Sequence, residues 1–142
     1  MATIELNKQK WDGEYEWIRQ GEEWSCAWGG SEAQWSFTIT PRIRPFIPTG
    51  TILEIAPGYG RWTNYLKDYC DGLVAIDLSE SCIQACRQRF SNSRYIAFHV
   101  NDGSSLEMVN DHSVDFVFSY DSLVHSEADV KDAYVSQISG KL

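Results

Sequence analysis

The sequence lacks the features of a metal-binding, secreted or membrane-spanning protein. Its four cysteines contain no Cys-x-x-Cys pair and its three histidines are scattered, which argues against a zinc site. It has neither an apolar signal region nor a hydrophobic run long enough to span a bilayer. We therefore expect a reduced, cytoplasmic protein that holds no metal.

Basic residues are also scarce. Lys and Arg number 12 against 20 Asp and Glu, so the formal net charge is −8. Because the phosphates of nucleic acids and of anionic membranes require a basic surface, this balance disfavours both as partners. The 142 residues, of which 43% are hydrophobic and 13% aromatic, suit one domain with a sizeable core.

The stretch over residues 51–62 organises the rest of the chain. Its apolar start predicts a buried strand, and Pro57, Gly58 and Gly60 end that strand in a tight turn. Aromatic and apolar residues then recur at helical spacing from 62 to 69. Glycines let a ligand approach the backbone closely, and the first turn of a helix leaves N–H groups free. The stretch therefore predicts a ligand site at the end of the strand.

The glycine spacing indicates which ligand class this site takes. A dinucleotide fingerprint is Gly-x-Gly-x-x-Gly, and the third glycine is missing here. The stretch instead resembles motif I of the class I S-adenosylmethionine-dependent methyltransferases, (Asp/Glu)-x-Gly-x-Gly-x-Gly. Glu54, Gly58 and Gly60 match it, with Ala56 in place of the first glycine. A strand, turn and helix without any ligand is the alternative interpretation of this stretch taken alone.

Acidic residues follow the next two expected strands, at 73–76 and 95–100. Asp77 ends the first of them, where a carboxylate can accept both hydroxyls of a ribose. The alternative is a surface acid before a helix cap. The resemblance implies that Leu78 lies in the same cofactor site. It also implies that Asp102 binds the adenine amino group beside a backbone N–H at Gly103, although Asp-Gly also forms turns without a ligand.

A fourth strand is expected over residues 114–120, and its start resembles motif IV of the family. The resemblance places Ser119, Tyr120 and Asp121 near the methyl group and the substrate. His125 follows, and its reference pKa suits proton removal near neutrality, so it is our candidate general base. Tyr120 and Asp121 are alternatives for that role, and a structural role for the histidine is the competing interpretation.

Residues 1–50 are expected to form a helical, aromatic-rich cap, because they hold five of the six tryptophans. Helices are expected over residues 5–20 and 32–40. The segment either packs as a cover on the sheet edge or closes as a lid over the cofactor, since lids exclude water from reactive centres. In the lid interpretation Trp28 and Trp35 contact the ligand.

Four strands that alternate with helices predict a Rossmann-like parallel α/β sheet with helices on both faces. The resemblance, which covers residues 51–142, implies the strand order 3-2-1-4. The family's full sheet has seven strands in the order 3-2-1-4-5-7-6, so we expect a truncated domain that lacks the last strands. The fourth strand would then form an exposed edge, which a second copy of the chain could cover as a homodimer.

The resemblance implies methyl transfer from S-adenosylmethionine to a small-molecule acceptor, of the type found in bacterial enzymes. Two alternatives stay open. The chain could be a non-catalytic module that binds S-adenosylmethionine or a related nucleoside, or a fragment of a nicotinamide-dependent oxidoreductase. The missing third glycine and the position of Asp102 disfavour the last one.

Overall fold

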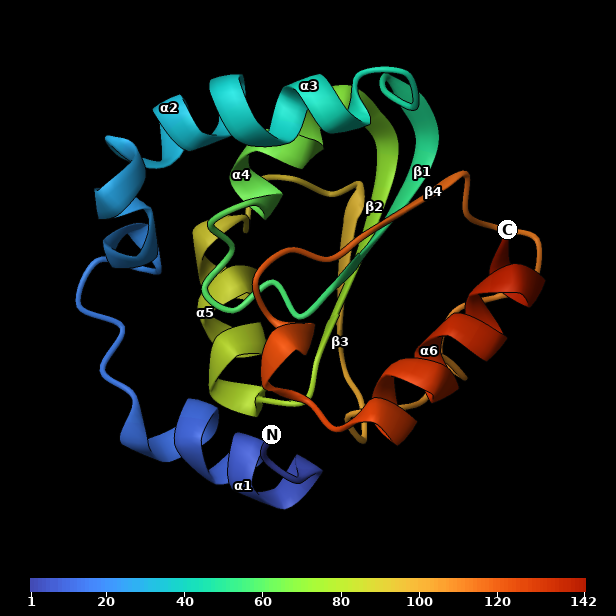
Figure 1. The fold of residues 1–142 in the computed structure, drawn as a ribbon. Coiled ribbons are helices and arrows are strands. Elements are labelled where there is room, and N and C mark those ends of the chain that lie inside the picture. Colours follow the sequence, from blue (N-terminus) through green and yellow to red (C-terminus); the bar gives the residue numbers. More distant parts are fainter.

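The computed structural model describes all 142 residues. A parallel sheet lies at its centre, in the strand order β3-β2-β1-β4 (Figure 1). The strands are β1 (Thr49–Ile55), β2 (Cys70–Asp77), β3 (Ile96–Val100) and β4 (Phe116–Phe118). The predicted fold class and strand order are confirmed. The fourth strand is shorter than predicted, because β4 pairs with β1 only from Ile52↔Phe116 to Glu54↔Phe118.

The sheet separates two hydrophobic cores, because successive side chains of a strand point to opposite faces. Ile52 of β1 packs into the larger core, together with Trp35, Ile39 and Ile47 of the N-terminal segment. Leu53, the next residue, packs into the smaller core on the other face. Residues before β1 thus share a core with the sheet.

Three helices connect or follow the strands. The first is α4 (Thr63–Leu66), which continues as a 3₁₀ turn over Lys67–Tyr69. The second is α5 (Glu80–Arg89), whose N-cap Ser79 accepts from the backbone N–H of Cys82 (3.1 Å). The third is α6 (Ala128–Lys141), preceded by a 3₁₀ turn over Leu123–His125. In Figure 1, α6 covers the face opposite to the one that α4 and α5 cover.

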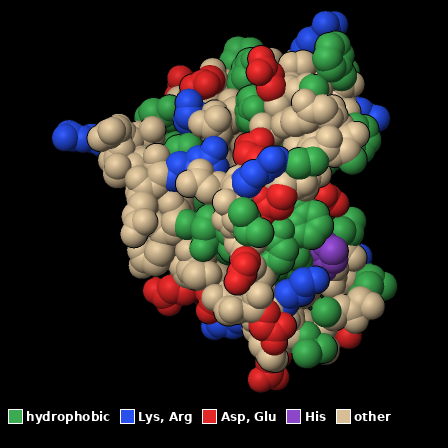
Figure 2. All heavy atoms as spheres, turned by 90° about the vertical axis from the view of Figure 1, so that its left-hand side faces the viewer, with side chains coloured by type: hydrophobic (Ala, Val, Ile, Leu, Met, Phe, Trp, Pro, Cys, Tyr) green, Lys and Arg blue, Asp and Glu red, His purple; other side chains and the backbone are tan.

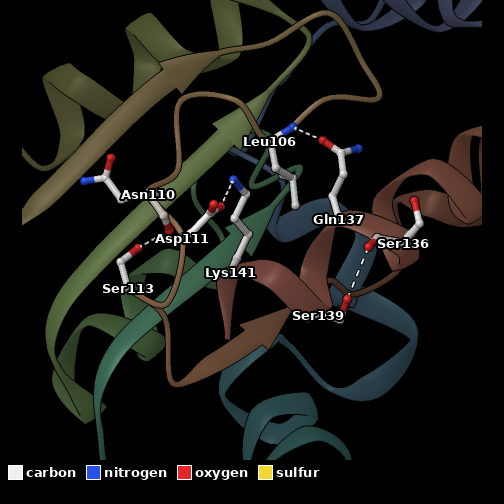
Figure 3. Close-up of polar contacts among 8 residues, drawn as sticks. All are labelled: Leu106, Asn110, Asp111, Ser113, Ser136, Gln137, Ser139 and Lys141. Carbon is white, nitrogen blue, oxygen red and sulfur yellow. Dashed lines mark hydrogen bonds and ion pairs between the residues drawn. The ribbon is translucent and has the colours of Figure 1, made fainter.

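Helix α6 is held against the loop that precedes β4. The backbone N–H of Leu106 donates to Gln137 Oε1 (2.8 Å), and Lys141 Nζ lies 2.8 Å from Asp111 Oδ1 (Figure 3). Ser126 and Asp129 have the Ser-x-x-Asp spacing of a capping box, but α6 does not begin with one. The N-cap residue is Glu127, and its side chain makes no capping hydrogen bond.

The N-terminal segment has less regular helix than predicted. Helix α1 (Ile4–Gln9) continues as a π-helical turn over Lys10–Glu14, and Tyr15 then takes an extended conformation. The predicted helix over 5–20 is therefore wrong beyond residue 14. A 3₁₀ helix follows over Glu22–Trp28.

The second predicted helix extends further than expected. Helix α2 (Ser31–Gln34), a π-helical stretch (Trp35–Ile39) and α3 (Thr40–Ile43) follow one another without a break. Pro41 does not end this run because it occupies the first turn of α3, where a missing N–H is tolerated. None of the helices is long and apolar enough to cross a membrane.

Candidate active site

A cavity of about 220 Å³ lies at the carboxyl ends of the strands, where parallel sheets bind their ligands. Residues that follow each of the four strands meet there with residues of the N-terminal segment. The lining consists of Asn7, Trp11, Trp17, Gly21, Trp24, Ala56, Pro57, Gly58, Tyr59, Arg61, Trp62, Ile76, Asp77, Leu78, Cys82, Gly103, Tyr120, Asp121, Ser122, Leu123, His125, Ser126 and Tyr134.

The turn after β1 gives the cavity its floor. Ala56 and Gly58 line the cavity, and both take left-handed backbone conformations, with φ of 59° and 57°. Such a conformation costs an alanine roughly 1–2 kcal/mol, so a strained residue stands where the motif has its first glycine. Gly60 has a different role. A Cβ there would lie 2.5 Å from the ring of Phe90, so this glycine lets the turn pack on α5.

Asp77 joins the ends of β1 and β2. Its carboxylate accepts from the backbone N–H of Gly58 (3.1 Å) and from that of Ser79 (2.9 Å). The residue is only 6% exposed. Burial raises the pKa of the Asp77 carboxyl to about 6, against the lowering effect of these hydrogen bonds. A carboxylate has lone pairs for more than two donors, so Asp77 retains acceptor capacity toward the cavity.

Glu54, the first residue of the motif, lies behind the turn and not in the cavity wall. Its side chain is buried, and Thr63 Oγ1 donates to Glu54 Oε2 (2.6 Å). Burial raises the pKa of the Glu54 carboxyl to about 7. Its contact with Thr63 ties β1 to the start of α4, so the structure gives this acid a role in holding the turn.

The segment after β4 brings the three predicted catalytic candidates into one cavity wall. Tyr120, Asp121 and His125 all line it. Asp121 has a φ of 59°, an uncommon conformation for a residue other than glycine. The His125 ring lies 5.5 Å from that of Trp11. Ser119 is exposed and outside the cavity, and its hydroxyl forms a hydrogen bond with Ser122 (3.0 Å).

The N-terminal segment closes the remaining side. Trp11, Trp17 and Trp24 line the cavity, and Trp17 stacks on Tyr59 with ring centroids 4.7 Å apart. The segment is anchored through Asp12 to the start of α5, where Asp12 Oδ1 accepts from Ser79 Oγ (2.8 Å) and from a backbone N–H (2.9 Å).

Three further predicted ligand contacts, besides Glu54 and Ser119, lie outside the cavity. The carboxylate of Asp102 is exposed and accepts from the backbone N–H groups of Ser104 and Ser105, so it closes its own turn. Only the neighbouring Gly103 lines the cavity. Trp28 is 52% exposed and does not line the cavity. Trp35 is buried in the larger core because the helical run over residues 31–43 lies on the sheet.

Sequence reasoning missed several residues of this wall, among them Asn7, Arg61 and Tyr134. Arg61 directly follows Gly60, in the turn that leads from β1 into α4. This position beside the expected ligand site could have indicated Arg61 from the sequence. Asn7 and Tyr134 come from α1 and α6, far from any motif, and no local pattern marks them.

A comparison with protein families identifies the domain. The family described as a methyltransferase domain matches residues 52–142, which include the glycine turn and everything after it. The chain belongs to this methyltransferase family. The predicted resemblance is therefore confirmed over most of the chain.

Individual relatives of this methyltransferase domain are distant. The ribosomal RNA small subunit methyltransferase A of Coxiella burnetii is 28% identical over 69 residues, which are 47% of this chain and 27% of that protein. The structure of phosphoethanolamine N-methyltransferase 1 of Haemonchus contortus covers 99% of this chain at 18% identity, with a TM-score of 0.67. The complex of DhpI with SAH covers 98% at 21% identity, with a TM-score of 0.70.

The two structural likenesses show the same fold. This methyltransferase domain corresponds to 31% of the Haemonchus chain and 63% of the DhpI chain. The match to the Coxiella methyltransferase spans about a quarter of that protein's length.

Proposed function

We propose that this domain binds S-adenosylmethionine in the cavity and supports transfer of its methyl group to a small-molecule acceptor. The observation that carries the proposal is the hydrogen bond between Gly58 N and Asp77, which joins the glycine turn to a buried carboxylate at the cavity floor. The Haemonchus and DhpI structures of the same fold are complexes with the demethylated cofactor, S-adenosylhomocysteine, which supports the same ligand here.

The residues present fit an adenosine group. Asp77 has unused acceptor positions for the two hydroxyls of a ribose, and Leu78 and Gly103 supply apolar and close-approach surface beside it. The carboxylate of Asp102 does not line the cavity, and its Oδ1 accepts from the N–H groups of its own turn. Recognition of the base therefore depends on the backbone at Gly103 and on packing.

S-adenosylmethionine supplies an electrophilic methyl group when it is bound. The task of the protein is then to align the acceptor and to exclude water. Trp11, Trp17 and Trp24 serve the second purpose, since they form an apolar cover over the wall that holds the polar residues. We assign to His125, which lines the cavity, the removal of a proton from an oxygen or nitrogen acceptor, with Tyr120 and Asp121 as the alternative bases.

A small molecule fits the surface better than a nucleic acid does. The formal net charge is −8, whereas phosphate backbones attract basic surfaces. On the face shown in Figure 2, Lys and Arg side chains lie scattered among Asp and Glu side chains. We therefore do not propose ribosomal RNA, which the name of the Coxiella relative gives as its substrate, as the methyl acceptor of this chain.

Titration calorimetry with S-adenosylhomocysteine and, separately, with NADH tests the cofactor. We expect binding of the first only. Binding of NADH alone would favour the oxidoreductase alternative. Methyl transfer to a panel of small acceptors then separates an enzyme from a non-catalytic binding module, which would bind the nucleoside and turn over nothing.

The role of His125 has its own test. We expect His125→Ala to lower turnover on an oxygen acceptor while the affinity for S-adenosylhomocysteine stays within about twofold, because the ring is not needed for the contacts at Asp77. His112→Ala is a matched control, since His112 is exposed and outside the cavity. Equal activity of the His125 variant removes the proposal for this residue.

We also propose that a second copy of the chain covers the edge of the sheet at β4. This strand has one sheet neighbour, β1, and exposed strand edges attract further strands. Phe46, which stacks on Phe116 of β4, is 59% exposed. A monomer in sedimentation whose amides over Phe116–Phe118 exchange rapidly would contradict this arrangement.

A further inference from the structure

Asn7 is a buried amide of α1 that uses only the nitrogen of its side chain. The residue is 5% exposed and lines the cavity. Its Nδ2 donates to the backbone oxygen of Ala2 and to that of His125, at 3.2 Å each. An amide nitrogen carries two hydrogens, so both are used, whereas no donor of the protein reaches Oδ1. Buried polar atoms normally have a hydrogen-bond partner, so this oxygen calls for one.

The two backbone carbonyl groups fix the direction in which the amide of Asn7 points. Both are acceptors, so only the amide nitrogen can face them, and Oδ1 points away from Ala2 and His125. Two side-chain atoms, Thr40 Oγ1 and Trp62 Nε1, are sealed from solvent without a partner. Oδ1 of Asn7 is not one of them, so it keeps accessible surface, and the accessible space beside Asn7 is the cavity. An acceptor atom of fixed orientation therefore faces the ligand site.

The same contacts place this acceptor beside the candidate base. The backbone of His125 accepts from Asn7, and the ring of His125 lies 5.5 Å from that of Trp11. Trp11 follows Asn7 by four positions in one helical run, and both residues line the cavity. Asn7 Oδ1 thus lies at the end of the cavity where we expect a proton to be removed from the methyl acceptor.

The rings and charges of the cavity wall favour a positively charged acceptor. The three tryptophans of the N-terminal segment line the cavity, and aromatic faces attract ammonium groups. One face of Trp11 already does so, since Lys10 Nζ lies 4.7 Å from its ring centroid. The wall also holds two acids, Asp77 and Asp121, against one basic residue that is always charged, Arg61. Its balance of charge therefore favours a cation over an anion.

The number of protons on the acceptor separates an amine from an alcohol. The single proton of a hydroxyl group either donates to Asn7 or is removed by His125, and it cannot do both. A primary ammonium has three N–H groups, so one can stay on Asn7 Oδ1 while His125 takes another. The neutral nitrogen then forms its new bond to the methyl carbon as the carbon–sulfur bond breaks, and the electrons of that bond stay on the sulfur. The product leaves as a methylated ammonium ion.

We infer that the methyl acceptor is a primary or secondary amine, which enters as an ammonium ion and donates one N–H to Asn7 Oδ1. This assignment deepens the proposed function and rests on it for the methyl transfer. Contact of Oδ1 with the amino group of the adenine is the competing use of the same atom, and the test below separates the two.

Titration calorimetry on the protein saturated with S-adenosylhomocysteine compares three probes of similar shape. 2-Phenylethylamine is a cation with three N–H groups, its N,N,N-trimethyl derivative keeps the charge without an N–H, and 2-phenylethanol is neutral with one O–H. We expect the amine to bind about 10- to 100-fold more tightly than either of the others, as for a hydrogen bond that involves a charged group. Mass spectrometry of methylated products is the second readout, and we expect the amine to be preferred over the alcohol.

Two substitutions of Asn7 separate contact with the ligand from a structural role. Asn7→Leu and Asn7→Asp both lose the donors to Ala2 and His125, but only the aspartate keeps an oxygen for the ammonium ion. We expect Asn7→Leu to bind 2-phenylethylamine about 10- to 100-fold more weakly, and Asn7→Asp to stay within about threefold of wild type. Asn92→Leu is the matched control, because Asn92 is exposed and lies outside the cavity.

Several outcomes would overturn the assignment. These are equal affinities of the wild-type chain for the amine and its trimethyl derivative, equal losses in the two Asn7 variants, and preferred methylation of the alcohol. If Asn7→Leu weakens binding of 5′-methylthioadenosine but not of its 6-desamino analogue, Oδ1 serves the adenine and the amine is excluded. If Asn7→Leu does not fold, the ratio of the wild-type affinities decides. A wild-type chain that does not bind S-adenosylhomocysteine ends the proposed function instead, and the three probes titrated alone then test Asn7.

Discussion

Substitution of Asp77 by asparagine should stabilise the protein and weaken its cofactor binding at the same time. The pKa of the buried carboxyl is raised from 3.8 to about 6, mainly by burial. In an acid with a raised pKa the folded state holds the proton more tightly, so stability falls as the pH rises from 3.8 through 6. Above pH 6 the ionised group costs the folded state roughly 3 kcal/mol, at about 1.4 kcal/mol per pKa unit.

Asparagine removes that cost and loses part of the local hydrogen bonding. The carboxylate accepts from two backbone N–H groups, those of Gly58 and Ser79, whereas the amide has one oxygen. One lost hydrogen bond costs about 1 kcal/mol, which leaves a net gain of roughly 2 kcal/mol at pH 7.5. At pH 5.0 the wild-type group is mostly protonated, and the gain should shrink by roughly 1.4 kcal/mol.

The assay is urea unfolding at pH 7.5 and pH 5.0, paired with calorimetry of S-adenosylhomocysteine binding. Asp71→Asn is the control, because Asp71 lies exposed at the other end of β2. We expect the Asp77 variant to bind about 10- to 100-fold more weakly, since ribose hydroxyls lose a charged acceptor. An unchanged affinity would refute the ribose contact. A stability difference that is the same at both pH values would refute the reasoning about the buried charge.

Three other predictions follow from the same region. Gly58→Ala should lower the free energy of unfolding by roughly 1–2 kcal/mol, because the φ of Gly58 is 57° and an added Cβ would lie 2.8 Å from the ring of Trp17. Ala56→Gly should raise the free energy of unfolding by up to about 1 kcal/mol, because the φ of Ala56 is 59°. Urea unfolding measures both changes. Glu54→Gln should flatten the decline in stability between pH 5 and 8, because the pKa of that carboxyl is raised to about 7 by burial; a parallel curve would contradict this. Asp12→Ala should increase amide exchange over residues 1–24 and leave that of the sheet unchanged, because the anchor to α5 is lost.

The parallel α/β class could be predicted because local signals agreed with the fold, and the strand order followed from the resemblance to the family. Apolar strands separated by helical spacing leave few topologies, and the glycine turn has a spacing that few ligand classes share. The shape of the N-terminal segment could not be predicted in this way. Its aromatic residues occur at spacings compatible with a long helix, yet Trp17 leaves helical geometry to stack on Tyr59, a contact over 42 positions of sequence.

The positions of the candidate site residues after the strands could be predicted from the sequence. The directions of their side chains could not. Asp102 follows β3 as expected, but the backbone N–H groups of Ser104 and Ser105 compete for its carboxylate, as they do in many turns that begin with aspartate. Asp77 faces the turn after β1 instead, because Gly58 N is its neighbour across the strand ends. Arg61 carries no motif signal, because it occupies one of the two unspecified positions between Gly60 and Thr63, where a dinucleotide fingerprint has its third glycine.

The aromatic cover has a practical consequence. Four of the six tryptophans, Trp11, Trp17, Trp24 and Trp62, line one cavity. Most of the indole emission of the chain therefore originates at a single place, and the protein carries its own optical reporter. Any molecule that enters should alter the colour and intensity of that emission, so occupancy can be followed in solution without a label.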